Sequence, residues 1–291
     1  MVGGTRPDTT TCNRQQFLSM ARSLSGFERL AADIGSANAG SIAELIFEAQ
    51  VRETNPADRY ILIAADQRPE YPARIDRLLQ AECTQIGERR AHAAALLKAT
   101  KAGRLRGWLA EMTEPEASYT QTRGSARSAT PEREIVKARD WIARSMHGDA
   151  KQTVLDVLTR HVLTAPAGAA LGPTPRLLDQ VHAEVVTDAP RVRSPNILTA
   201  YPSSIGGRFL LELIFRWTAS AVWPAPGDER WLDVALFYLG AVATVQGYPD
   251  GNKRAARMGY AITLLKGKRR FVAPSPGLES ELVRMRRIDD E

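Results

Sequence analysis

Residues 246–257 read Gln246-Gly247-Tyr248-Pro249-Asp250-Gly251-Asn252-Lys253-Arg254-Ala255-Ala256-Arg257, and this stretch decides how the chain is interpreted. The segments 231–245 and 258–265 on either side are strongly apolar and predict two helices. Pro249 and Gly247 would end the first helix, and Asp250 or Asn252 can cap the second. Because helices flank the Asp-Gly-Asn turn on both sides, a β-hairpin is disfavoured and a helix–loop–helix unit is predicted.

The chemistry of this loop is that of a phosphate site. A tight turn into a helix start aims free backbone N–H groups at one point, where the helix dipole adds positive potential. Lys253, Arg254 and Arg257 add three charges, and the two arginines share one face of the first turn because they are three residues apart. Guanidinium groups bind phosphate oxygens in a bidentate manner. Asp250 supplies one hard oxygen, which suits Mg²⁺ shared with substrate phosphates. The alternative is an ordinary surface turn, since Pro-Asp-Gly-Asn-Lys is a common turn sequence.

The order of these residues resembles the active-site motif of the Fic/Doc family, His-x-Phe-x-(Asp/Glu)-Gly-Asn-(Gly/Lys)-Arg-x-x-Arg. The segment from Asp250 to Arg254 and the later Arg257 fall in register with it. Tyr248 takes the aromatic position, where it would anchor the loop in the core, and the lysine in the Gly/Lys position is closer to the Doc branch. The flanking helices extend the resemblance over about 195–267, whereas the first 130 residues resemble no family that we can name.

The resemblance implies a role for each matching position. Asp250 would hold Mg²⁺, and the backbone amides of the loop would form an anion hole for ATP or another nucleotide. Arg257 would stabilise the transferring group or shape the loop. The implied phosphate-binding positions are Gly251, Asn252, Lys253, Arg254 and Arg257.

The departure from the motif is Gln246, which stands where the family has its catalytic histidine. A glutamine amide has no basic lone pair near neutral pH, and general-base catalysis is worth roughly 10²–10⁴-fold. Three hypotheses remain. In the first, the protein is an enzyme in which Gln246 only orients the nucleophile. In the second, it is an enzyme whose substrate, such as a carboxylate, needs no base, or whose base comes from elsewhere. In the third, it is a Fic-fold binding or scaffold protein that has kept the phosphate site and lost the chemistry. The histidines are distant in sequence and are expected to serve structure or surface: His92, His147, His161 and His182.

These hypotheses allow three functions. The first is transfer of a nucleotidyl or phosphoryl-containing group to a protein target, as by an AMPylator-like nucleotidyltransferase. The second is a catalytically inactive Fic-fold binding or regulatory protein, and the third is a tailoring enzyme that acts on a small molecule. The segment 190–207, which holds Pro190, Pro195, Pro202 and the pair Gly206-Gly207, predicts an irregular structure or a short β-hairpin. The resemblance implies that 196–204 is the flap of the family, which would align a target segment by strand addition.

Most of the chain predicts helices joined by loops rich in proline and glycine, so the fold class is mainly α. A polar, turn-rich segment at 113–130 predicts a linker or mobile loop. It would separate an N-terminal helical region, 1–112, from a Fic-like domain, 131–291. The short apolar run 60–64 fits either a strand or the middle of a helix.

Two stretches have the spacing (Ser/Thr)-x-x-x-Glu of the helix that blocks many Fic proteins by pairing its glutamate with the second motif arginine. They run from Thr130 to Glu134 and from Ser275 to Glu279, and neither has the Gly or Asn that should follow. Both are better explained as the N-terminal caps of helices.

Composition and charge narrow the function classes. A net charge of +6 suits an anionic partner, but no zinc-finger spacing or aromatic signature indicates nucleic-acid recognition. Cys12 and Cys83 have no metal spacing and are expected to be reduced thiols. No run of about 18 apolar residues predicts a membrane span, and no cleavable signal is apparent at the N-terminus. We expect a cytoplasmic protein, or one delivered without such a signal, as bacterial toxins and effectors can be.

Overall fold

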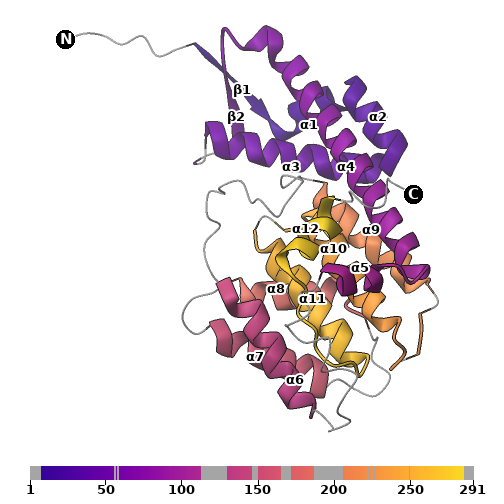
Figure 1. The fold of residues 1–291 in the computed structure, drawn as a ribbon. Helices are drawn as coiled ribbons and strands as arrows, with labels where there is room; N and C mark the ends of the chain where they lie inside the picture. Colours follow the sequence, from indigo (N-terminus) through magenta and orange to yellow (C-terminus); the bar gives the residue numbers. More distant parts are fainter. Residues whose placement is uncertain are drawn as a thin grey trace. The chain divides into compact units, whose positions relative to one another are not determined.

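The computed structural model describes residues 8–55, 57, 59–112, 130–145, 150–164, 172–186, 206–221, 223–225, 227–248 and 250–284 (Figure 1). The fold is mainly helical with one small antiparallel sheet, which confirms the predicted fold class. The chain divides into two compact units, residues 1–88 with 204–209 and residues 89–203 with 210–291. In the part of the chain described, no helix is both long and apolar enough to cross a membrane.

The N-terminal unit combines the sheet with helices. Strand β1 (Thr9–Asn13) lies beside β2 (Tyr60–Ala64) (Figure 1). The two strands pair antiparallel, with Thr11 opposite Leu62. The apolar run that fitted either a strand or a helix is therefore a strand, and its alternate residues Ile61 and Ile63 are buried, as a half-buried strand requires. The helical elements of the N-terminal unit are α1 (Arg14–Arg22), α2 (Ser25–Ile34), α3 (Ser36–Thr54), the 3₁₀ turn η1 (Arg68–Glu70) and the first part of α4 (Tyr71–Lys101).

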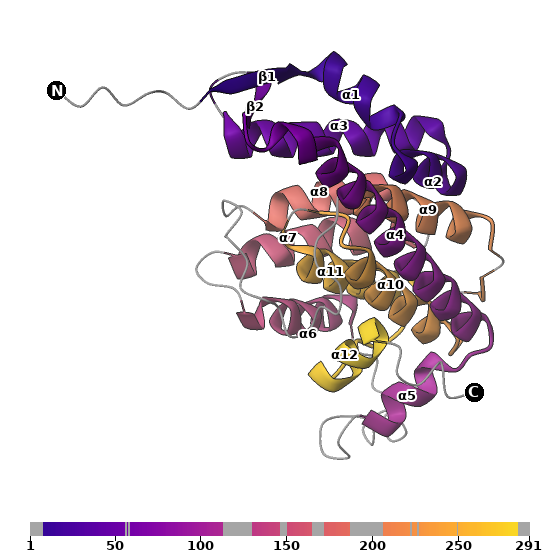
Figure 2. The same ribbon diagram turned by 90° about the horizontal axis from the view of Figure 1, so that it is seen from above.

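The C-terminal unit is built around α10 (Trp231–Val245). Every residue of α10 except Ala243 is buried, so the helix is apolar on all sides and forms the centre of the core. It packs against α11, α12 and α5, and α11 also packs against α6, α7 and α8 (Figures 1 and 2). The elements are α5 (Leu105–Met112), α6 (Pro131–Ile142), η3 (Ala143–Ser145), α7 (Ala150–Leu163), α8 (Pro175–Val185), α9 (Gly207–Ala219), α11 (Asn252–Lys266) and α12 (Pro276–Arg284).

The helix–loop–helix prediction around the loop is confirmed. The first helix ends at Val245, and the second begins at Asn252, so the basic residues of the loop belong to the first turns of α11. The predicted flap at 196–204 and most of the predicted linker, 113–129, lie outside the described residues. The division into 1–112, 113–130 and 131–291 stays a prediction.

Candidate functional site

The loop leaves α10 through Gln246. This residue has a left-handed backbone (φ 53°, ψ 49°), which stops the helix, and its side chain is 4% exposed. Its amide nitrogen Nε2 donates a hydrogen bond to the carbonyl of Ala243 in the last turn of α10. The carbonyl of Val245 accepts a hydrogen bond from Nη1 of the buried Arg89 at 3.3 Å. The end of α10 is thus held by two side chains, and one of them occupies the position where the motif has its base.

The loop is closed by Asn252. Its Oδ1 accepts a hydrogen bond from the backbone N–H of Tyr248 at 2.8 Å, and its Nδ2 donates to the carbonyl of the same residue at 2.6 Å. Asn252 is 3% exposed, and Tyr248 is buried as well, as expected of an anchor. Both ends of the Asn252 side chain are therefore used to shape the loop, and a phosphate contact from this position would come from its backbone N–H.

The start of α11 offers such N–H groups. Gly251 is the N-cap with a left-handed backbone (φ 74°), and its carbonyl accepts the first intrahelical hydrogen bond, from Ala255 at 2.9 Å. The amides of residues 252–254 precede that bond and have no acceptor within the helix. Free N–H groups of this kind, together with the helix dipole, are favourable for binding an anion.

Arg254 lies beside Asp250 at the mouth of this site. Its Nη2 is 3.7 Å from Oδ2 of Asp250, and its Nη1 donates to the carbonyl of Val185 at 3.4 Å. The Arg254 side chain is 23% exposed and that of Asp250 is 29% exposed, so both can meet a ligand from solvent. The other carboxylate oxygen of Asp250, Oδ1, accepts a hydrogen bond from the N–H of Gly251 at 2.6 Å.

Arg257 points elsewhere and is buried. Its Nη2 donates to both carboxylate oxygens of Glu279 on α12, at 2.8 and 3.0 Å. Its guanidinium carbon lies 5.0 Å from the ring centre of Trp141, within the range of a cation–π contact. Its Nε is buried without a hydrogen-bond partner in the described part of the chain. Lys253 approaches the same carboxylate at 3.9 Å, and its pKa is lowered by burial and by Arg257, against the opposing effect of Glu279.

Glu279 belongs to the second of the two stretches with the spacing of the blocking helix. Ser275 caps α12, since its Oγ accepts a hydrogen bond from the N–H of Leu278 at 3.1 Å, so the predicted cap is present. The glutamate of this stretch also pairs with the second motif arginine. The other stretch differs, because Glu134 accepts a hydrogen bond from the N–H of Phe271 at 2.7 Å and pairs with Lys137.

The space between these groups is small. A cavity of about 20 Å³ lies between α10, α11 and α12, and it can hold a water molecule but no nucleotide. Its lining residues are Leu239, Ala243, Gln246, Lys253, Ala256, Glu279 and Val283. Gln246 and Lys253 therefore face one cavity, and the Glu279 side chain fills the space next to Arg257.

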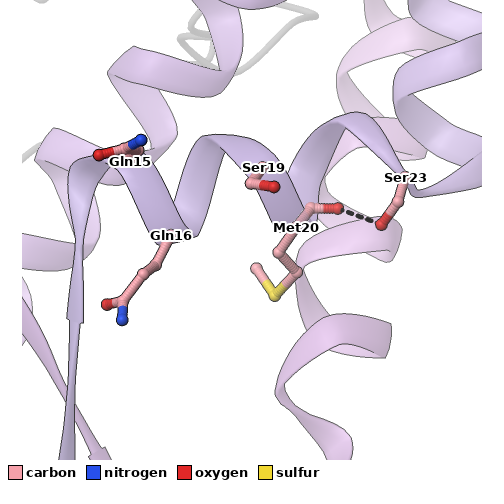
Figure 3. Close-up of a pocket in the computed structure, with 5 residues that line it drawn as sticks. All are labelled: Gln15, Gln16, Ser19, Met20 and Ser23. Carbon is pink, nitrogen blue, oxygen red and sulfur yellow. Dashed lines mark hydrogen bonds between the residues drawn. The ribbon is translucent and has the colours of Figure 1, made fainter.

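A second, shallow depression lies on α1 of the N-terminal unit. Figure 3 shows that its lining side chains come from this one helix and from the residue that caps its C-terminus: Gln15, Gln16, Ser19, Met20 and Ser23. None of these side chains is charged, so the depression has no cationic side chain of the kind found at the start of α11.

Sequence reasoning missed His182 of α8, which the fold brings to the loop. Its ring stacks on that of Tyr248, with centres 4.0 Å apart and an angle of 8°. Its Nε2 is 2.7 Å from the carbonyl oxygen of Asp250. The hydroxyl of Tyr248 donates to Asp179 on the same helix at 2.9 Å. No signal in the sequence marks these contacts, which join residues 66 to 69 positions apart.

The residues present fit a magnesium ion that arrives with a nucleotide. The described residues contain no group of three or more side chains that could hold a metal by themselves. Asp250 instead offers a single, partly exposed carboxylate next to the anion site, and Mg²⁺ is commonly bound by one or two carboxylates together with substrate phosphates.

Comparison with known proteins supports the fold. No family model and no curated protein matches the chain. Among solved structures, the chain is similar to the crystal structure of the Fic-domain-containing AMPylator VopS, with a TM-score of 0.61 and 18% sequence identity. The match covers 92% of this chain and 81% of that one, so it extends into the N-terminal unit. The architecture of the chain is therefore a Fic-like fold.

Proposed function

We propose that this protein binds a nucleotide with Mg²⁺ at residues 250–257 and transfers a nucleotidyl or phosphoryl-containing group to a protein target. The observation that carries the proposal is the anion site at the start of α11. There the amides of residues 252–254 precede the first intrahelical hydrogen bond, and Arg254 lies beside Asp250, whereas the charge of Arg257 is neutralised by Glu279 in the described conformation. This arrangement occurs in a fold similar to that of an AMPylator.

Each side chain has a part in this proposal. The amides and Arg254 would bind phosphate oxygens, and Arg257 would neutralise charge on the transferring group once Glu279 has left it. Asp250 would hold Mg²⁺, which neutralises phosphate charge when it is bound. Asn252 and Gly251 would shape the loop. The donor is a nucleotide, with ATP as the first one to test.

The proposed transfer needs an acceptor for the proton of the attacking group. A hydroxyl nucleophile must lose a proton as its oxygen bonds to phosphorus and the leaving phosphate departs, and the amide of Gln246 cannot accept that proton. A carboxylate nucleophile has no proton to lose. We therefore favour either a carboxylate target or slow transfer to a hydroxyl, in which positioning and charge supply the acceleration.

A second candidate function is nucleotide binding without chemistry. One observation favours it: Nε2 of Gln246 donates to the carbonyl of Ala243, so this side chain caps a helix. A protein of this kind would use the closed and open states of the site as a regulatory signal.

The contact between Arg257 and Glu279 leads us to propose that the site is regulated. The glutamate neutralises a cation that the phosphates would need, and its side chain lines the small cavity next to Lys253. We expect the described conformation to be a closed state, which opens when α12 moves or when a ligand displaces the carboxylate.

Calorimetry tests the binding function. ATP, GTP, CTP and UTP with Mg²⁺ would be titrated into the wild-type chain, into Glu279→Ala and into the double variant Glu279→Ala/Arg254→Ala. Binding by Glu279→Ala that is lost in the double variant Glu279→Ala/Arg254→Ala supports the proposal. No binding by either the wild type or Glu279→Ala, or equal binding with and without Arg254, would overturn it. Intact-mass analysis after incubation with a lysate then distinguishes transfer from binding alone.

A further inference from the structure

Helix α8 presents one face to the loop. Asp179, His182 and Val186 follow each other at intervals of three and four residues, which places them in one row on the helix surface and just beyond its end. Asp179 accepts the hydrogen bond from the hydroxyl of Tyr248, and His182 contacts both Tyr248 and Asp250. This row therefore supports the loop from outside, whereas Asn252 closes it from inside.

His182 makes two different contacts with the loop. Nε2 lies 2.7 Å from the carbonyl oxygen of Asp250, and because a carbonyl only accepts, Nε2 must carry the hydrogen. The imidazole ring also stacks on Tyr248 at 4.0 Å. One contact fixes the main chain of the residue that would bind Mg²⁺, and the other fixes the aromatic anchor two positions earlier.

The approach of the loop to α8 is close. A Cβ atom added to Gly251 would collide with Val186 and would lie 3.1 Å from Nε2 of His182. Gly251 also has a positive φ of 74°, which side chains rarely adopt. Arg254 donates to the carbonyl of Val185 at the end of α8, so the first turn of α11 is tied to the same helix.

We infer that His182 is a positioning residue of the nucleotide site. It holds the Asp250 carbonyl and the Tyr248 ring so that the carboxylate of Asp250 and the amides after it are aimed at one point. The inference rests on the proposed function for its purpose, but the contacts themselves exist without a ligand. His182 is not the missing base through Nε2, because that nitrogen donates to the main chain.

Two variants of the full-length chain separate the contacts. His182→Phe keeps an aromatic ring for Tyr248 and removes the hydrogen bond to Asp250. His182→Gln loses the ring but has an amide N–H of similar reach. Glu184→Gln is the matched control, since Glu184 lies on the same helix and pairs with Arg160 at 2.9 Å.

The first measurement is amide hydrogen exchange of residues 247–254 without nucleotide, with a peptide of α7 as a check on global loosening. The loss of one hydrogen bond should raise exchange of the loop about five- to tenfold in His182→Phe. His182→Gln should recover at least half of this protection, and Glu184→Gln should match the wild type. Less than a twofold rise in His182→Phe, or no recovery in His182→Gln, overturns the inference.

The second measurement is the affinity for ATP with Mg²⁺ in chains that also carry Glu279→Ala. His182→Phe should weaken binding about five- to tenfold, with recovery in His182→Gln. If His182→Phe speeds amide exchange in the loop but leaves the affinity for ATP unchanged, then His182 has only a structural role and the inference is overturned. If Glu279→Ala binds no nucleotide while exchange behaves as expected, the proposed function fails and the positioning of the loop by His182 stands.

Discussion

Arg257 and Glu279 form a buried ion pair in which a single guanidinium nitrogen, Nη2, donates to both carboxylate oxygens at 2.8 and 3.0 Å. Nε of the same guanidinium is buried without a partner among the residues described. A carboxylate or phosphate bound in the bidentate manner would use two guanidinium nitrogens. The pair is therefore incomplete, and a phosphate could replace the carboxylate with a gain in hydrogen bonding.

Glu279→Ala should open the site. The substitution removes the carboxylate from the cavity beside Lys253 and leaves Arg257 without its counter-ion, so the affinity for ATP with Mg²⁺ should rise at least about tenfold. The free variant should be less stable by about 3–5 kcal/mol, because breaking a buried pair leaves an uncompensated charge. Calorimetry and thermal unfolding measure the two effects, and added ATP should restore part of the lost stability.

The matched control is Glu134→Ala. Glu134 is 3% exposed and Glu279 is 6% exposed, and each is the glutamate of a Ser/Thr-x-x-x-Glu stretch. Glu134, however, binds Phe271 and Lys137. Its loss should lower stability without raising the affinity for ATP. An equal gain of affinity in both variants would show that general loosening, and not the release of Arg257, opens the site.

Ser275→Ala should raise the affinity for ATP as Glu279→Ala does, but by less. The hydroxyl of Ser275 caps α12 through the N–H of Leu278, and loss of such a cap costs about 1 kcal/mol. Because α12 carries Glu279, fraying its first turn should favour the open site and raise ATP affinity by a few-fold. Asn13→Ala removes a comparable cap from α1 in the N-terminal unit and should leave the affinity unchanged. ATP affinity that stays at the wild-type value in Ser275→Ala would argue that α12 does not control access.

The sequence predicted the local structure of the loop except for the helix cap, because Gly251, and not Asp250 or Asn252, is the N-cap of α11 and no side chain caps it. Apolar segments on both sides of the loop predicted α10 and α11, and the Asp-Gly-Asn turn predicted the helix start that leaves the amides of residues 252–254 available. These features depend on residues a few positions apart, which is the range over which helix signals act. The mainly α fold class followed in the same way.

The contacts of the site between residues distant in sequence could not be predicted. The spacing of Arg254 and Arg257 suggested two cations on one face of a helix, but Arg257 is buried against Trp141 and Glu279, whereas Arg254 contacts Asp250 and α8. Tertiary packing decides which partner each arginine of α11 meets. His182 shows the same limit, since its place beside the loop depends on how α8 packs against α11.

Asp233 should make the free energy of unfolding depend on pH. It is fully buried in the first turn of α10, its Oδ1 accepts a hydrogen bond from the N–H of Arg106 at 2.9 Å, and burial raises its pKa above 3.8 in spite of that bond. The pKa of Asp233 is higher in the folded chain than in the unfolded chain. Its contribution to the free energy of unfolding is therefore complete below about pH 3.8 and is lost as the pH rises through the folded pKa.

Asp233→Asn should therefore gain stability relative to the wild type as the pH rises from about 3.5 to 7. The asparagine keeps an acceptor for the Arg106 N–H and carries no charge, so the gain at pH 7 should be on the order of 1 kcal/mol. Urea unfolding of both chains at several pH values measures it. A stability difference that does not change with pH would show that Asp233 titrates alike in the folded and unfolded chains.

Gln246→His tests whether the amide at this position limits transfer. Histidine tolerates the left-handed backbone that Gln246 adopts, and the position faces the cavity shared with Lys253 and Glu279. In a chain that also carries Glu279→Ala, a base at residue 246 should raise transfer from labelled ATP to a hydroxyl-bearing target by roughly 10²–10⁴-fold. Intact-mass analysis of the chain itself would detect self-modification in the same samples.

Gln246→Ala in the same background is the control, because it removes the hydrogen bond to Ala243 without supplying a base. Transfer that rises equally in both variants would reflect a looser end of α10 and not general-base catalysis. If the histidine adds nothing while Glu279→Ala still binds ATP, then the bound nucleotide is not attacked by a hydroxyl at this place. The remaining choices are then a nucleophile that needs no base, which a carboxylate-bearing target would reveal, and a site that binds its nucleotide without chemistry.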